Sequence, residues 1–271
     1  MDTSIQPCAL LLLVGSDWQV TAISANAAML GGQRPADAIG QPLADLIGSK
    51  AIHSLRNRLS WLSNDESEVH DFGVQWGEVT LDIRASRMGE GHLIEAELAV
   101  ESRLPDGIGM VRSMSDRLDG SDPLKLADQA MRQLCALTGF ERFGLTDLEG
   151  TTIVSAGRRE LKMPAGVDAG MAAPTILADV DAEPVAMAGE ISASKMVRVS
   201  FRAPGEDTRE RLSGSGIAAA MTLPLRIDGK PVAAVHAYHS EPRRCSAERR
   251  SVAHLFAERL VARMARQGWK P

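Results

Sequence analysis

Histidine is the side chain in this sequence best suited to bind a metal or carry a proton, and two histidines lie close together near its end. His236 and His239 are three residues apart in Pro231–His239, which predicts a β-strand. Side chains alternate between the two faces of a strand, so these two point to opposite faces. They cannot chelate one metal ion together, and the remaining histidines are scattered. We therefore expect no metal site.

A second group of chemically active side chains is the acidic cluster of Asp179, Asp181 and Glu183. Such a cluster can bind a cation, but it is more often a solvated loop, and we favour the loop. The segment Gly214-Ser-Gly216 lacks the strand-to-helix context of a phosphate-binding loop and predicts a turn. No Ser-His-Asp or Cys-His spacing indicates a nucleophile. The sequence therefore favours a binding or sensory protein over an enzyme.

The composition is that of a globular protein of about two domains, with 271 residues of which 44% are apolar and 24% charged. A net charge of -5 argues against a nucleic-acid-binding protein. The longest apolar run, Ala9–Val14, is too short to span a membrane, and the start of the chain lacks the basic region of a signal peptide. The cysteines, Cys8, Cys135 and Cys245, form no CxxC pair. We expect a reduced, cytoplasmic protein that binds no membrane.

Residues 1–102 predict a first α+β domain. The pattern of apolar and turn residues predicts strands at Ala9–Val14, Trp18–Ser24, Val69–Trp76, Val79–Arg87 and His92–Val100, and helices at Ala27–Leu30, Pro35–Ala38, Pro42–Ile47 and Ala51–Leu62. Residues 103–121 are rich in Gly, Asp, Ser and Arg and predict a linker. Whether Ile108–Leu118 forms a helix within it is left open.

Residues 122–271 predict a second α+β domain. It begins with a clear helix, because Asp122 suits the N-cap, Pro123 suits the first helical position and Gly139 suits the C-terminal stop. Asp228-Gly229 predicts a tight hairpin turn. The other predicted elements are strands at Arg142–Thr146, Thr152–Ala156, Lys195–Phe201, Met221–Ile227 and Pro231–His239, an apolar segment at Thr175–Asp179, and a closing helix at Ser246–Arg266.

Several segments, read in order, resemble the photosensory core of bacterial phytochromes, a PAS domain followed by a GAF domain. In the first domain they are Ile5-Gln-Pro-Cys-Ala-Leu-Leu11, Ser24-Ala-Asn-Ala-Ala28, Gly40-Gln-Pro-Leu-Ala-Asp-Leu46 and His92-Leu-Ile-Glu-Ala-Glu97. In the second they are Leu137-Thr-Gly-Phe-Glu-Arg142, Ala178-Asp-Val-Asp-Ala-Glu-Pro-Val185, Asp228-Gly229, and His239 with Pro242-Arg243. The resemblance implies an α+β fold in which each domain has a central antiparallel sheet flanked by helices.

The resemblance also implies a linear tetrapyrrole such as biliverdin in the GAF domain. It assigns a propionate of this cofactor to Arg198, with Arg202 as an alternative register, a propionate-binding hydroxyl to Thr222, and a pocket histidine to His239. Together these groups suit a carboxylated ligand, because guanidinium binds carboxylate in bidentate fashion. Each also has an ordinary alternative: a surface ion pair for Arg198, a strand hydroxyl for Thr222 and a packed strand-end imidazole for His239.

The sequence departs from the family where the cofactor would be held. The family's attaching cysteine lies upstream of the segment that starts at Ile5, where this sequence has none, and Cys8 lies inside that segment. Thr146 stands where a pocket Tyr is expected, and Asp168 is a poor substitute for the family's pocket Asp. With only five Phe, four Trp and one Tyr, a flat cofactor would sit among aliphatic side chains. We also expect the family's knot to be absent, because only four residues precede Ile5.

The closing helix has apolar residues on one side and arginines mainly on the other, and the resemblance implies a homodimer through the GAF helices. We expect no kinase or DNA-binding module in this chain, so that its output passes through a protein partner. The leading hypothesis is a phytochrome-like sensory protein that binds a biliverdin-type tetrapyrrole non-covalently. The alternatives are a chromophore-less PAS-GAF module that regulates a partner, and a haem-binding or haem- and bilin-processing protein with His239 or His236 as axial ligand.

Overall fold

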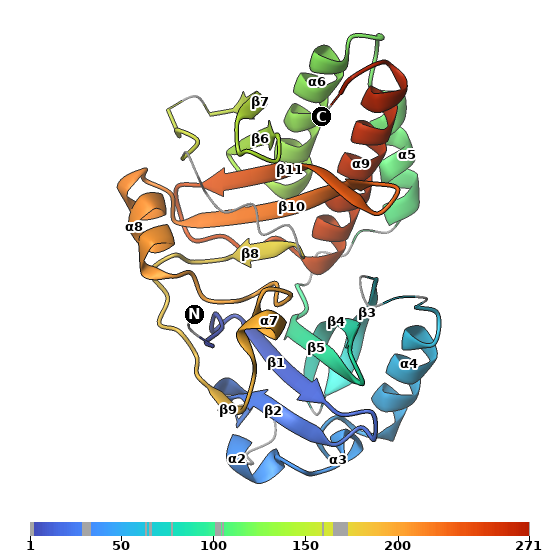
Figure 1. Cartoon of the computed structure of the whole chain (residues 1–271), viewed down its shortest axis with the longest axis vertical. Coiled ribbons are helices and arrows are strands. Elements are labelled where there is room, and N and C mark those ends of the chain that lie inside the picture. Colours follow the sequence, from blue (N-terminus) through green and yellow to red (C-terminus); the bar gives the residue numbers. More distant parts are fainter. Residues whose placement is uncertain are drawn as a thin grey trace. The chain divides into compact units, whose positions relative to one another are not determined.

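The computed structural model describes residues 3–28, 34–62, 64, 67–76, 78–100, 104, 106–158, 160–164 and 173–270. The chain forms two compact units (Figure 1). The first contains Met1–Glu101 together with Ala182–Ala203, and the second contains Ser102–Asp181 together with Pro204–Pro271. The predicted α+β class is confirmed, since each unit has an antiparallel sheet with helices.

The first unit is built on a six-stranded sheet in the order β3-β4-β5-β1-β2-β9. Its strands are β1 (Ala9–Val14), β2 (Val20–Ser24), β3 (Glu68–Trp76), β4 (Val79–Met88), β5 (Gly91–Leu98) and β9 (Met187–Gly189). Its helices are η1 (Ala25–Ala27), α2 (Pro35–Ala38), α3 (Leu43–Ile47), α4 (Ser49–Leu59) and α7 (Ala193–Met196). The strands predicted before residue 101 and the helix now labelled α4 are confirmed to within three residues.

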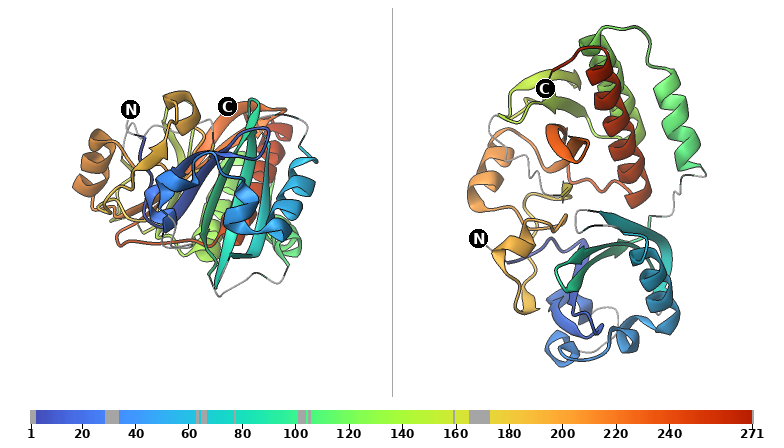
Figure 2. Two further views of the ribbon diagram at one scale, coloured as in Figure 1. Left: turned by 90° about the horizontal axis from the view of Figure 1, so that it is seen from below. Right: turned by 45° about the vertical axis from the view of Figure 1, so that its right-hand side comes forward.

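Strand β1 is apolar throughout because both of its faces are buried. Leu10, Leu12 and Val14 pack into the core that α4 covers. Leu11 and Leu13 pack on the other face with apolar side chains from the later segment, which include Met196 and Val199. A strand buried on both faces reads as a continuous apolar run rather than an alternating one. Figure 2 shows this unit from two further directions.

Residues 182–203 belong to the second half of the sequence but fold as part of the first unit. Strand β9 pairs with β2, and Ile5 bridges to Val185 on one side and to Arg202 on the other. Ile5 and Val185 exchange both backbone hydrogen bonds, at 2.9 and 2.8 Å, and Gln6 N donates to Phe201 O at 2.8 Å. Ile5 is therefore held between the two ends of this segment, with Val185 on one side and Arg202 on the other. This pairing lies within the first unit, so the expected absence of the family's knot stays a prediction.

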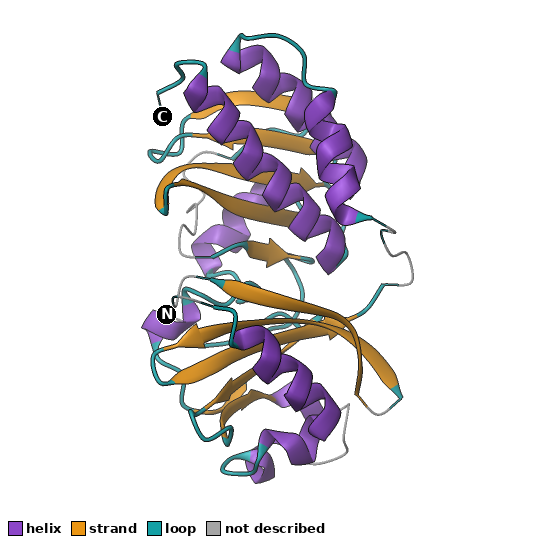
Figure 3. Ribbon diagram, turned by 90° about the vertical axis from the view of Figure 1, so that its right-hand side faces the viewer, coloured by secondary structure: helices purple, strands orange, loops and turns teal. Residues whose placement is uncertain are grey.

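The second unit is built on a five-stranded sheet in the order β7-β6-β11-β10-β8. Its strands are β6 (Arg142–Thr146), β7 (Thr152–Gly157), β8 (Thr175–Leu177), β10 (Ala219–Ile227) and β11 (Lys230–His239). Its helices are α5 (Gly107–Asp116), α6 (Pro123–Thr138), α8 (Glu206–Gly214) and α9 (Ala247–Arg266). The three long helices of this unit, α5, α6 and α9, form one layer against the sheet (Figure 3).

Local signals account for the ends of these elements. Asp122 accepts a hydrogen bond from Leu124 N at 3.0 Å and caps α6, which ends at Gly139 in the left-handed region, φ +72°. Ser246 caps α9 through the backbone N–H of Arg249. The predicted cap at Asp122, the stop at Gly139 and both long helices are confirmed, whereas the capping role of Ser246 was not predicted. Helix α5 lies within the predicted linker and packs against α9 as part of the second unit.

The strand predicted at Lys195–Phe201 is wrong. Residues Ala193–Met196 form the short helix α7, which opens where Lys195 N and Met196 N donate to the carbonyl of Ser192. The alternating apolar side chains that suggested a strand lie instead on this helix and the turn after it, where Val199 is fully buried. Among the described residues, no helix is long and apolar enough to cross a membrane.

Candidate functional site

A buried polar chain crosses the middle of the second unit's sheet. The imidazole of His236 on β11 forms hydrogen bonds with two threonine hydroxyls. Its Nδ1 lies 3.0 Å from Thr222 Oγ1 on β10, and its Nε2 lies 3.1 Å from Thr146 Oγ1 on β6. The three side chains meet because Thr222 is directly opposite His236 and Thr146 is on the adjacent strand. All three are buried, and both imidazole nitrogens are occupied. We call this side of the sheet, with Gly144, Thr146, Thr222, His236 and Tyr238, the Thr–His face.

The hydrogen bonds suit a neutral imidazole. The hydroxyl of Thr146 lies 3.5 Å from the carbonyl of Ala234 and can donate its proton there. Its oxygen then accepts from the Nε2–H of His236, which leaves Nδ1 to accept from the hydroxyl of Thr222. Burial lowers the pKa of His236 to about 4, because it removes the charged imidazolium from water. The ring of Tyr238 lies parallel to that of His236, with centroids 6.3 Å apart, and burial raises the pKa of its hydroxyl. The face is thus polar inside but uncharged.

Apolar side chains of the same unit cover the Thr–His face. Leu161, Leu177, Val180, Leu212 and Ile217 form one buried cluster with Tyr238, and Met163 packs against that cluster. A Cβ added to Gly144 would collide with the sulfur and methyl group of Met163, so this methionine lies directly on the strand. Only 2% of Tyr238 and 3% of His236 are exposed. Side chains of this unit therefore pack on this face at Gly144 and Tyr238.

The structure separates the two predicted site residues of this unit. Thr222 lies on the Thr–His face, but His239 points to the opposite face, because it is three residues from His236 along β11. There its ring meets the edge of Phe140 at 6.2 Å, and Phe140 also packs against Phe143. Its Nδ1 accepts a hydrogen bond from Glu241 N at 3.0 Å. His236, and not His239, is therefore the histidine beside Thr222.

The two candidate arginines lie in the first unit and contact backbone carbonyls. Arg198 Nη1 donates to the carbonyl of Arg87 at 3.1 Å. Arg202 Nη1 donates to the carbonyls of Val197 and Val199 at 3.1 and 3.2 Å. By chain position both lie in the segment that joins the first unit, whereas Thr222 and His239 lie in the second. These contacts hold both arginines against the backbone of the first unit.

The remaining sequence candidates have simple placements. Asp168 lies outside the described residues. Asp179 accepts a hydrogen bond from Asp181 N at 3.0 Å, which is the loop turn that we favoured for the acidic cluster. Within the described ranges, no group of three or more His, Cys, Asp and Glu side chains could hold a metal ion. Cys8 and Cys135 are half-buried and Cys245 is buried, and no disulfide joins any of the three to another described residue.

Comparison with protein-family models identifies both halves of the chain. The model of the GAF domain matches residues 122–264, and a model of the PAS fold matches residues 1–99. The chain belongs to the GAF domain family. With the PAS fold before it, the chain is a PAS-GAF module, as its motifs predicted. No curated protein sequence matches the chain.

Solved structures of bacterial phytochromes share the fold. The chromophore-binding domain of Stigmatella aurantiaca phytochrome P1 has a TM-score of 0.79 at 20% identity, and the match covers 96% of this chain and 95% of that one. The chromophore-binding domain of an unusual bacteriophytochrome from R. palustris has a TM-score of 0.80 at 19% identity, with 97% and 94% covered. The photosensory core module of the Stigmatella aurantiaca phytochrome has a TM-score of 0.79 at 19% identity. This chain covers only 58% of that module.

Sequence reasoning missed the parts of this site that depend on register. His236 was considered only as a metal or haem ligand, and Gly144 and Met163 were not singled out. Tyr238 lies on the face opposite to His239, a relation that strand alternation alone decides.

Proposed function

We propose that this PAS-GAF module acts in signalling through protein–protein contacts and that its GAF sheet carries no linear tetrapyrrole. The observation that supports this proposal is the burial of the Thr–His face beneath side chains of the same unit. A ligand-binding face is concave and lined by groups that a ligand can reach. Here the polar groups of the face are satisfied by one another and the apolar ones by the covering cluster.

The described residues do not fit a tetrapyrrole at this face. Thr222 is engaged with His236, and both imidazole nitrogens already have hydroxyl partners. The guanidinium groups of Arg198 and Arg202 donate to backbone carbonyls of the first unit. A large flat ligand would also have to displace Met163 and the side chains packed around it.

Non-covalent binding of a biliverdin-type tetrapyrrole, our leading hypothesis from the sequence, is the second candidate. Its support is the likeness to two structures described as chromophore-binding domains, each matched over at least 94% of its length. Haem held by a single histidine has less support. His236 uses both of its nitrogens, and the Nδ1 of His239 accepts from Glu241 on the face away from Thr222.

A titration with biliverdin separates these candidates. We expect the absorption spectrum of the purified chain with biliverdin to equal the sum of the separate spectra. The chromophore-binding domain of Stigmatella aurantiaca phytochrome P1 serves as the positive control. A saturable, red-shifted and narrowed absorption band would overturn the proposal and establish the second candidate. The variant Met163→Ala tests whether the methionine is what closes the face, because it opens space above Gly144.

Homodimerisation through the GAF helices is also proposed. Its support is an apolar surface on α5 and α9, where Ile108 is 67% and Leu255 is 45% exposed. These residues flank the point at which Gly107 approaches the side chain of Val252. Sedimentation should show a dimer that Ile108→Glu with Leu255→Glu dissociates. A wild-type chain that remains monomeric at high micromolar concentration would refute this part.

The basic side of the closing helix contributes less to such an interface than its sequence suggested. Arg249 donates to the carbonyl of Leu137 at 2.6 Å, and Arg263 donates to the carbonyl of Leu118 at 3.1 Å. These contacts stabilise the C-terminal ends of α6 and α5, where carbonyls lack helical partners. These two arginines of the closing helix are therefore bound to backbone carbonyls of the second unit.

A further inference from the structure

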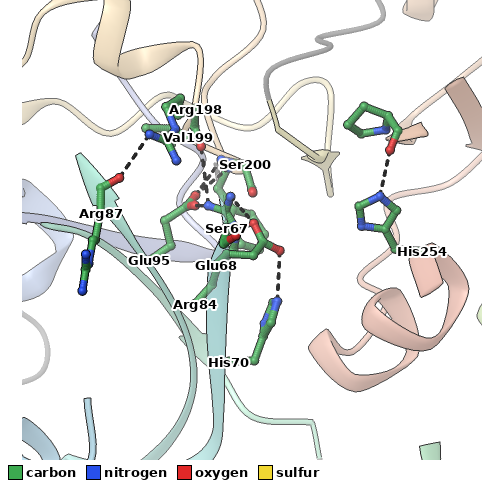
Figure 4. Close-up of polar contacts among 12 residues, drawn as sticks. Ser67, Glu68, His70, Arg84, Arg87, Glu95, Arg198, Val199, Ser200 and His254 are labelled. Atoms are coloured by element: carbon green, nitrogen blue, oxygen red, sulfur yellow. Dashed lines mark hydrogen bonds and ion pairs between the residues drawn. The ribbon is translucent and has the colours of Figure 1, made fainter. Parts of the chain in front are cut away.

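A nearly inaccessible carboxylate lies in the sheet of the first unit. Glu95 of β5 is 1% exposed. Removing a carboxylate from water is costly unless its oxygens receive hydrogen bonds and a compensating charge. Both are present (Figure 4): Oε1 accepts from Ser200 N at 2.7 Å and from Phe201 N at 3.1 Å, and Oε2 pairs with Arg84. The protein thus surrounds this anion with two backbone donors and one guanidinium.

Arg84 connects Glu95 to the edge of the sheet. It is directly opposite Glu95 on the paired strands β4 and β5, and opposite His70 on β3. Its Nε donates to Glu68 Oε2 at 2.6 Å, and Glu68 Oε1 in turn lies 3.1 Å from His70 Nε2. Burial alone would lower the pKa of Arg84, but the charges of Glu68 and Glu95 outweigh burial and raise it. The guanidinium therefore stays charged and balances both carboxylates.

The two backbone donors belong to the segment 182–203, about 105 residues later in the sequence. Ser200 and Phe201 are buried and lie outside any helix or strand, so the carboxylate provides what a sheet partner would otherwise provide. The carbonyl of Phe201 also accepts a hydrogen bond from Gln6 N, and Ala203 N donates to Ser4 O at 3.0 Å. The residues that Glu95 binds are therefore those that hold the start of the chain.

We propose that the Glu95 carboxylate is a latch for segment 182–203. It fixes residues 200 and 201 on the sheet, and through them the C-terminal end of the segment, which is hydrogen-bonded to Ser4 and Gln6. Breaking the ion pair with Arg84 or neutralising Glu95 releases this end of the segment, while the strands of the sheet stay paired.

The variant Glu95→Gln tests the latch because it keeps the size of the side chain but places an amide NH2 opposite Arg84. Hydrogen exchange of the Ser200 and Phe201 amides should accelerate about tenfold or more, since the bonds lost are charge-assisted. Trypsin should then cleave after Arg198 and Arg202, which the wild-type fold protects. Asp71→Asn is the matched control, because Asp71 is a buried carboxylate of the same sheet that binds Arg58 and Ser54 instead.

Two outcomes would overturn the proposal: unchanged exchange at residues 200 and 201 in Glu95→Gln, or an equal acceleration in Asp71→Asn. Slow exchange of the amides of β1 that donate to β2 and β5 shows whether the pairing of β1 with these two strands survives. If Glu95→Gln does not fold, Glu95→Asp replaces it. The aspartate keeps the charge for Arg84 but is one methylene too short to reach both amides, so the same acceleration is expected.

Discussion

Replacing His236 by Gln should remove a large part of the pH dependence of the second unit's stability. Folded His236 has a pKa of about 4, against an ordinary value of about 6.5 for an unfolded chain. Between these values the unfolded state binds more protons than the folded state, so stability rises with pH. The contribution is complete above pH 6.5 and is lost as the pH falls to 4.

The magnitude follows from the shift. A difference of about 2.5 pKa units at 1.36 kcal/mol each corresponds to about 3 kcal/mol. The Gln side chain does not titrate, so the variant lacks this loss. It also lacks the imidazole's bonds to Thr146 and Thr222, which should cost roughly 1–3 kcal/mol at every pH. The wild-type protein should therefore be the more stable at pH 7, and the two proteins should converge near pH 4.5.

Urea unfolding of both proteins between pH 7 and pH 4.5 measures the effect, because groups common to both cancel in the difference. Titration of the His236 ring by NMR provides a direct check on the pKa itself. A difference in unfolding free energy that stays constant from pH 7 to pH 4.5 would refute the reasoning, as would a ring that titrates near pH 6.5.

Substitutions at three further positions test the strand end and the helix caps of the second unit through its melting temperature or urea midpoint. Gly157→Ala should destabilise by at least about 2 kcal/mol, because φ is +107° and the new Cβ would collide with the backbone of Glu141; an effect below about 0.5 kcal/mol would contradict this geometry of the strand end. Asp122→Ala should cost about 1 kcal/mol through the lost cap of α6, whereas Asp122→Ser should cost little. Gly139→Ala should cost about 1 kcal/mol at φ +72° and should also disturb Arg243; Gly139→Asn should cost less, since Asn tolerates this conformation.

The hairpin shows how far the sequence could predict the site. The turn at Asp228-Gly229 and both strands were correctly predicted, and a straight register from that turn would place His239 on the same face as Thr222. A β-bulge between Leu225 and Arg226 shifts the pairing by one residue, so that Thr222 meets His236 instead. One extra residue moves every later side chain to the other face. Pro231, which cannot donate to the ladder, was the available signal for this irregularity.

The segment 182–203 shows what sequence reasoning could not reach. Its apolar alternation predicted a strand at Lys195–Phe201, since local patterns carry no information about a partner more than 100 residues away. The conformation is decided instead by Glu95, whose carboxylate binds the amides of Ser200 and Phe201. Glu95 itself reads as an ordinary polar residue of a strand, and only its burial beside Arg84 reveals its role.

The return of residues 182–203 to the first unit has a consequence for the order of folding during synthesis. When the ribosome has made the first 101 residues, strand β2 still lacks its neighbour β9, and Glu95 lacks the two amides it will bind. The nascent first unit must therefore wait, with an open sheet edge and an exposed apolar face around Leu11 and Leu13, until about 100 more residues have emerged. A fragment that ends at residue 101 should accordingly aggregate, and adding residues 182–203 as a separate peptide should rescue its solubility.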